Sequence, residues 1–261
     1  ETAMNLCINV SLAYELGAER TALFAVEAAK TQGQVVVEDQ LEIDDAEITV
    51  IDGEWGVGQH NWTRVTTDVI QLRYRAKVCV SRPPARLKNL ATTPLHELPS
   101  EQVTFFRPSR FCQSDQIEPF VARQFGHLSG GEKIMAILDW MAAEMAYDPT
   151  CSNSDTTLLE TFEVRRGVCR DYAHLLCGLA RASHIPARYV SAYGASVEPP
   201  DFHAAVQVWL DNQWQLIDPT GMCSADELVI IAVGRDAADV PFMETPDEAR
   251  FVAQQVRVTR E

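Results

Sequence analysis

The first eighty residues alternate between apolar and polar side chains in the manner of β-strands. The clearest run spans 70–80, where apolar residues occupy every second position and mostly charged residues lie between them. A period of two places one face of a strand on a core and the other in water. Shorter β-branched runs at 35–37, 41–43 and 48–51 are separated by Asp, Gly and Gln. The pattern predicts several short strands in an antiparallel β-sandwich.

Two consecutive prolines, Pro83 and Pro84, end this pattern, because each removes a backbone N–H donor from the sheet. We therefore expect an N-terminal β-sandwich domain over 1–82, a linker over 83–100 and a second domain over 101–261.

The second domain begins with helical patterns. Ser129 precedes a predicted helix over 131–146, in which apolar residues recur every three to four positions. Another helix is predicted over 156–164, and a third from Gly167 to about residue 183, because Pro186 makes the preceding residue extended.

Three apolar runs follow these helices, at 189–193, 202–210 and 214–217. They predict strands of one antiparallel sheet, so the fold class is α+β.

The charge balance argues against two classes of partner. The chain has 22 Lys and Arg residues against 37 Asp and Glu residues, a net charge of −15. Such a surface repels phosphate backbones and anionic lipid, so we expect neither a nucleic-acid nor a membrane-surface role. No apolar run is long enough to span a bilayer. The first residues lack the regions of a secretory signal, although a removed signal peptide stays open as an alternative.

The cysteines and histidines fit no disulfide framework and no metal motif. The seven cysteines are odd in number and form no C-x-x-C pair: Cys7, Cys79, Cys112, Cys151, Cys169, Cys177 and Cys223. This usage predicts a reducing, cytoplasmic compartment. None of the six histidines shows a paired metal-binding spacing, so we expect no metal and no cofactor. His174 lies about 140° around the helix from Cys169 and is interpreted as a structural residue.

Two glycine-rich segments are interpreted as structural. The segment 128–132 (Leu-Ser-Gly-Gly-Glu) is similar to a signature loop of transport ATPases, but the chain has no P-loop. An N-capped helix start explains it better. The glycines of 53–58 are interpreted as a turn, because no helical pattern follows them.

Cys169 is the first candidate for chemistry. It falls in the first turn of the third predicted helix, where unpaired N–H groups and the positive end of the dipole favour a thiolate, the nucleophilic form. Arg165, Arg166 and Arg170 would add to this effect. As an alternative, these arginines pair with the neighbouring acidic residues Glu163 and Asp171.

His203 and Asp218 are the next candidates, on two neighbouring strands. If Asp211 and Asn212 form a two-residue loop, His203 lies opposite Thr220 and is diagonal to Asp218 on the same face, about 7–8 Å away. A carboxylate in this position fixes the histidine tautomer, while the other ring nitrogen serves a nucleophile. Spacing alone does not bring the Cys169 helix to this hairpin.

Four segments together resemble the core of the transglutaminase-like superfamily: 166–175 (Arg-Gly-Val-Cys-Arg-Asp-Tyr-Ala-His-Leu), 185–190 (Ile-Pro-Ala-Arg-Tyr-Val), 201–204 (Asp-Phe-His-Ala) and 214–220 (Trp-Gln-Leu-Ile-Asp-Pro-Thr). The upstream segment 108–112 and the β-rich N-terminus resemble a bacterial branch in which a β-domain precedes the catalytic core.

The resemblance implies a papain-like α+β catalytic core over 101–261 with a catalytic triad. In it, Cys169 is the nucleophile, His203 the base and Asp218 its orienting partner. Two positions depart from the family pattern: His184 stands where relatives often have Gly, and Ala205 stands where an aromatic residue commonly follows His-Ala. Neither belongs to the triad.

These residues predict acyl transfer through a thioester. The Cys169 thiolate attacks an amide carbonyl, His203 protonates the leaving nitrogen, and the Cys169 backbone N–H is an oxyanion donor. A second donor is expected from a side chain, with 105–116 as the candidate segment. Hydrolysis of a peptide or isopeptide bond in a peptide or protein substrate is favoured, because the chain contains no identifiable calcium loop. A transglutaminase with an amine acceptor and a non-catalytic binding module are the alternatives.

Overall fold

The strand predicted over 70–80 forms β6 (Val69–Val80) in the computed structural model of the protein, which describes residues 3–261. Its apolar residues, including Leu72, Tyr74 and Val78, are buried, whereas the residues between them are at least partly exposed. The alternation read from the sequence therefore separates a core face from a solvent face.

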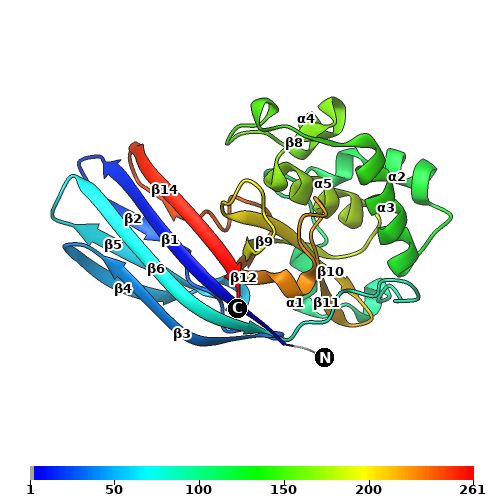
Figure 1. The fold of residues 1–261 in the computed structure, drawn as a ribbon. Helices are drawn as coiled ribbons and strands as arrows, with labels where there is room; N and C mark the ends of the chain where they lie inside the picture. The colour runs from blue at the N-terminus through cyan, green and yellow to red at the C-terminus, as the bar shows by residue number, and fades with distance from the viewer. Residues whose placement is uncertain (1–2) are drawn as a thin grey trace.

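Two four-stranded antiparallel sheets face each other in the lobe at the left of Figure 1. The first has the order β14 (Ala249–Arg260), β1 (Met4–Leu16), β6, β3 (Gln34–Ile43). The second has the order β13 (Met243–Glu244), β2 (Thr21–Phe24), β5 (Gln59–Val65), β4 (Ala46–Asp52). Apolar residues of both sheets, such as Leu6, Leu72 and Phe24, share one core. The predicted sandwich is confirmed.

The C-terminal strand differs from the predicted domain limits. Strand β14 lies within 101–261, yet it pairs antiparallel with β1 along most of its length. The predicted second domain is therefore not a separate continuous unit. The reason is that β1 would otherwise be an open edge, and the C-terminus returns to cover it.

The second lobe is built of helices around a third sheet (Figure 1). The sheet order is β11 (Gln213–Ile217), β10 (His203–Leu210), β9 (Ala187–Gly194), β12 (Leu228–Gly234). The α-helices are α1 (Ser100–Thr104), α2 (Glu118–Phe125), α3 (Gly130–Glu144), α4 (Leu158–Val164) and α5 (Cys169–Ala182). A short parallel pair is formed by β7 (Ala146–Tyr147) and β8 (Arg166–Gly167). Single 3-10 turns cover Glu54–Gly56, Leu95–Glu97, Ser114–Gln116, Pro149–Cys151 and Ala225–Glu227.

The three predicted helices and the three predicted strands of this lobe are present within a few residues of their predicted ends. Strand β12 was not predicted. Every one of its residues is buried, so no alternation marks it in the sequence.

The segment 128–132 is a helix start, as predicted, with Ser129 at the N-cap of α3. The two glycines serve close packing against the linker. A Cβ at Gly131 would lie 1.7 Å from the Leu87 carbonyl oxygen, and Gly130 has a φ of 53°. None of the helices described is long and apolar enough to cross a membrane.

Candidate active site

Cys169 is the first residue of α5, as the sequence predicted. Asp171 stabilises this helix start, because its Oδ2 accepts a 2.8 Å hydrogen bond from the Val168 backbone N–H. Gly167 makes room for that carboxylate: a Cβ there would lie 2.5 Å from Asp171 Oδ2. The Cys169 side chain is half-buried, at the leading end of a helix whose remaining residues are almost all buried.

The hairpin of β10 and β11 has the predicted register. Asp211 and Asn212 both have positive φ, 54° and 59°, as a two-residue hairpin turn requires. Val206 pairs with Ile217, and the ladder continues in register to the turn. His203, at the start of β10, and Asp218, just beyond β11, consequently meet: His203 Nε2 lies 2.9 Å from Asp218 Oδ2.

Asp218 is held by its own loop. Its Oδ1 accepts hydrogen bonds from the Thr220 backbone N–H at 2.9 Å and the Thr220 hydroxyl at 2.7 Å, and its Oδ2 accepts one from the Cys223 N–H at 3.0 Å. Burial raises the pKa of the Asp218 carboxyl, but the hydrogen bond and charge of His203, together with Thr220, lower it below its ordinary value. The carboxylate is therefore both fixed and ionised.

The second nitrogen of His203, Nδ1, is buried and has no hydrogen-bond partner in the described chain. It is the nitrogen left for Cys169, whose thiol lines the same cavity. Burial lowers the pKa of His203, but the hydrogen bond and charge of Asp218, together with the nearby Cys169 sulfur, outweigh this effect and raise the pKa to about 10. This environment favours an imidazolium beside the sulfur. Catalytic hydrogen bonds are often long before substrate binds.

The three arginines near Cys169 have partners other than its thiol. Arg170 approaches Asp171 at 3.4 Å and binds the Asn153 carbonyl, so it follows the structural alternative. The guanidinium of Arg165 stacks on two aromatic rings instead. Arg166 lies 3.9 Å from Asp148.

Tyr147 is a residue of this site that the sequence did not single out. Burial raises the pKa of its hydroxyl to about 12, and the charge of the nearby Cys169 thiol adds to this rise. The Tyr147 hydroxyl is therefore close enough to Cys169 for the two groups to interact. The segment 105–116, where a second donor was expected, contributes the ring of Phe111 to the cavity instead.

The cavity beside Cys169 has a volume of about 400 Å³ and largely apolar walls. Phe202, next to His203, stacks on Phe242 with centroids 4.7 Å apart and planes at 9°. Phe242 directly precedes β13, which pairs with β2 of the sandwich. One wall of the cavity is therefore attached to the sandwich lobe, a relation that no local pattern in the sequence predicts.

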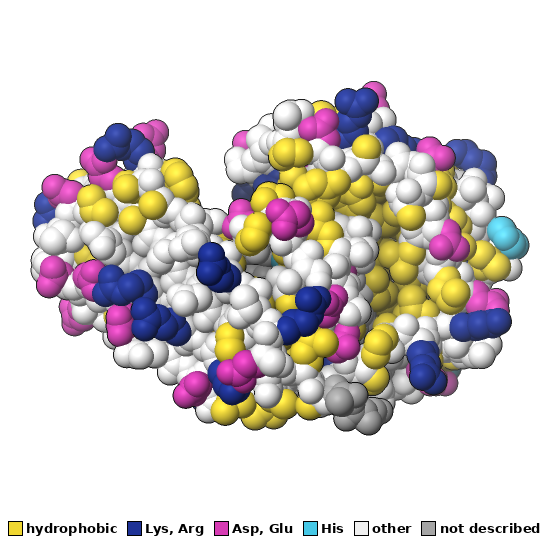
Figure 2. All heavy atoms as spheres, in the orientation of Figure 1, with side chains coloured by type: hydrophobic (Ala, Val, Ile, Leu, Met, Phe, Trp, Pro, Cys, Tyr) yellow, Lys and Arg dark blue, Asp and Glu magenta, His cyan; other side chains and the backbone are white. Residues whose placement is uncertain are grey.

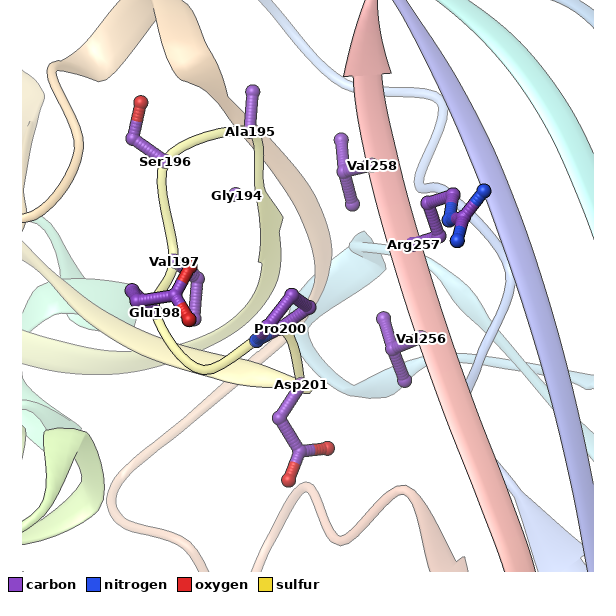
Figure 3. Close-up of a pocket in the computed structure, with 10 residues that line it drawn as sticks. All are labelled: Gly194, Ala195, Ser196, Val197, Glu198, Pro200, Asp201, Val256, Arg257 and Val258. Atoms are coloured by element: carbon purple, nitrogen blue, oxygen red, sulfur yellow. The ribbon is translucent and has the colours of Figure 1, made fainter.

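The loop before His203 also rests on the sandwich. Val256 and Val258 of β14 point towards this loop, and Arg257 points away from it (Figure 3). Asp201 of the loop accepts a 2.7 Å hydrogen bond from Gln254 on the same strand. On the outside of the molecule the two lobes are separated by a hollow at the top of the view in Figure 2.

His174 is structural, as predicted. It is fully buried, its ring stacks on Phe111, and its Nε2 accepts a 3.1 Å hydrogen bond from the Ala237 N–H. Burial lowers its pKa well below the ordinary value. Among residues 3–261, no group of three His, Cys, Asp or Glu side chains is arranged to hold a metal ion.

Residues 119–219 match the family model of the transglutaminase-like superfamily. The crystal structure of a candidate cysteine protease from Cytophaga hutchinsonii is 30% identical and superposes with a TM-score of 0.92, covering 100% of this chain and 91% of that chain.

Two curated relatives are similar over a shorter stretch. An uncharacterized protein of Mycobacterium leprae is 34% identical over 117 residues, which is 41% of this chain and 41% of the relative. Another, of Mycobacterium tuberculosis, is 32% identical over 127 residues, which is 41% of this chain and 40% of the relative. The chain thus spans about two fifths of the length of these relatives.

Proposed function

The chain belongs to the transglutaminase-like superfamily, and on this premise we propose that it hydrolyses peptide or isopeptide bonds through a cysteine thioester. The observation that carries the proposal is the proximity of three groups: a sulfur at a helix start, an imidazole beside it, and a buried carboxylate 2.9 Å from that imidazole. This is the arrangement that an activated nucleophile requires.

Acylation is the first half of the reaction. The Cys169 thiolate attacks the carbonyl carbon, and the negative charge that develops on oxygen accepts hydrogen bonds from the Cys169 N–H and the Tyr147 hydroxyl. The imidazolium of His203 gives its Nδ1 proton to the leaving nitrogen. The C–N bond then breaks, the amine departs and a thioester remains.

Deacylation reverses the role of the histidine. Neutral His203 takes a proton from water as the water oxygen attacks the thioester carbonyl. The C–S bond breaks, the carboxylic acid departs, and the thiolate–imidazolium pair is restored. Asp218 stabilises the imidazolium in both halves and holds its tautomer.

Two alternatives share parts of this scheme. With an amine in place of water, the same thioester yields a new amide, as in a transglutaminase. A binding module that keeps the fold would use no thioester at all.

One set of assays separates the three functions. Peptide, isopeptide and glutamine-amide substrates are incubated with and without a primary amine, using the parent protein, Cys169→Ala and the control Cys151→Ala, which alters an exposed thiol. We expect release of free acid by the parent and by Cys151→Ala, and none by Cys169→Ala. Amide formation in preference to acid would support the transglutaminase. Equal rates for the parent and Cys169→Ala would overturn the enzyme proposal.

A further inference from the structure

A second cavity, of about 520 Å³, lies on the face of the β9–β10–β11 sheet that points away from α5. Val206 and Val208 pack into the core shared with α5, so the alternate residues Gln207 and Trp209 face the other way and line this cavity. Its lining shares no residue with the cavity of Cys169. We call it the Arg188 cavity. Its size is that of a ligand site.

Arg188 is the feature of this cavity that needs an explanation. The side chain belongs to a residue only 8% exposed, and its Nε donates a 2.7 Å hydrogen bond to Gln207 Oε1. Neither Nη atom has a hydrogen-bond partner, and no carboxylate in the described chain forms an ion pair with Arg188. Glu101 influences it only at longer range. Most of the side chain is buried, but the two Nη atoms are not among the fully buried atoms and are accessible from the cavity. A largely buried cation without an anion is costly, so this guanidinium is suited to bind one.

Among the residues that the structure describes, this cavity contains a single free cation, Arg188. Arg82 also lines it, but donates to the carbonyls of Ala225 and Leu228 and to Gln34 Oε1. One available guanidinium matches the charge and the planar, two-oxygen edge of a carboxylate better than a doubly charged phosphate.

The surroundings of Arg188 suit a peptide chain. The guanidinium carbon lies 4.2 Å from the centre of the Trp214 ring, and the indole Nε1 of Trp209 is buried with no acceptor among the described residues. Strand β11 is the edge of the sheet. The pairing of Leu210 with Gln213 leaves the backbone N–H and C=O of Trp214 and Leu216 pointing outward.

We infer that the Arg188 cavity binds the carboxyl-terminal end of a peptide. The α-carboxylate pairs with the two Nη atoms of Arg188, and the residues before it lie along the free edge of β11, in the manner of strand addition. The site is independent of the proposed catalysis, although β10 and β11 also carry His203 and lead to Asp218.

The test is a binding titration with matched ligands. Protein whose Cys169 has been alkylated is titrated with a tryptophan-free acetyl-tetrapeptide carrying either a free carboxyl or an amidated end. Binding is followed by calorimetry and by the fluorescence of Trp209 and Trp214. We expect the acid to bind at least tenfold more tightly than the amide. Equal affinities overturn the inference without bearing on the thioester, since the active site is blocked in both titrations.

Variants and small anions locate the interaction. Arg188→Lys keeps the positive charge but removes the two parallel N–H donors of the guanidinium. We therefore expect it to remove most of the preference for the free acid over the amide. The surface variant Arg123→Gln, on α2, should leave the preference unchanged. Trp209→Phe offers a second test should Arg188→Lys not fold. Acetate that binds as tightly as the peptide acid would assign the site to small carboxylates, and inorganic phosphate that binds more tightly would overturn carboxylate recognition.

Discussion

His203 Nε2 and Asp218 Oδ2 lie 2.9 Å apart, with both side chains enclosed, although fifteen positions separate the two residues. One tight turn accounts for the contact, because Asp211 and Asn212 adopt the positive φ values that a two-residue hairpin demands. The register that follows carries both residues to the same end of the hairpin, where α5 begins.

Asp218→Asn is expected to lower kcat by about 10²–10⁴-fold with little change in KM, because an amide neither stabilises an imidazolium nor enforces its tautomer. Steady-state kinetics with a peptide substrate measure the effect. Asp211→Asn, a change of the same chemistry at the tip of the same hairpin, is the control and should retain parental activity. Similar losses in both variants would mean that hairpin stability, and not the carboxylate, is responsible.

The free energy of unfolding should depend on pH, because the pKa of His203 is about 10 in the folded protein, against an ordinary value of 6.5. The folded protein keeps this proton from pH 6.5 to 10, whereas the unfolded chain loses it near 6.5. The contribution of protonated His203 to the stability of the fold is therefore complete below pH 6.5 and is lost as the pH rises towards 10.

We expect iodoacetamide to alkylate Cys169 faster than any other cysteine, at a rate that stays high well below pH 8. Peptide mass mapping across pH 6–10 measures it, with the exposed Cys151 as internal reference. His203→Gln should abolish the difference between the two thiols. Cysteines that all react with the ordinary pH dependence of a free thiol, near 8.5, would contradict the thiolate–imidazolium pair.

Tyr147→Phe tests the second oxyanion donor. Losing one such donor costs about 10²–10³-fold in kcat, and KM should change little, since the ring is kept. Tyr172→Phe is the matched control, because its ring centroid lies 6.1 Å from that of Tyr147 and its hydroxyl has no role in the scheme. A parental kcat in Tyr147→Phe would remove the hydroxyl from the mechanism, while leaving Cys169, His203 and Asp218 untouched.

The site residues identified from the sequence are those whose positions depend on a single helix start or a single hairpin. A helix start defines the environment of Cys169, and one hairpin defines the distance between His203 and Asp218. Tyr147 and Phe242 reach the site from separate segments that have neither periodicity nor motif, and only tertiary packing brings them there. Sequence patterns report which face of an element is buried, but not which distant element buries it.

The same reasoning explains why β12 and β14 were not predicted. Strand β12 is buried on both faces, and β14 has only one fully buried residue, Val256. In neither strand is one face buried and the other exposed. A period of two in the sequence arises only from that difference in burial between the two faces.

Phe242→Ala opens the aromatic wall of the Cys169 cavity and removes the stacking partner of Phe202. For substrates with an aromatic residue next to the scissile bond we expect kcat/KM to fall about tenfold or more, with a much smaller change for alanine-containing counterparts. Phe251→Ala, at an exposed position of β14, is the control. Equal losses for both substrates would show that the wall supports folding rather than substrate choice.

Strand β14 joins the C-terminus to the sandwich, so its burial should control the stability of the whole chain. Val256 is 4% exposed, and Val256→Asp places a carboxylate in that apolar site. We expect the free energy of unfolding to fall by about 3 kcal/mol, measured as a lower urea midpoint. Gln255→Asp, the exposed neighbour on the same strand, should change it by less than about 0.5 kcal/mol. Equal effects of the two variants, or an unchanged midpoint in Val256→Asp, would mean that β14 contributes no buried surface to the cooperative unit, despite its pairing with β1.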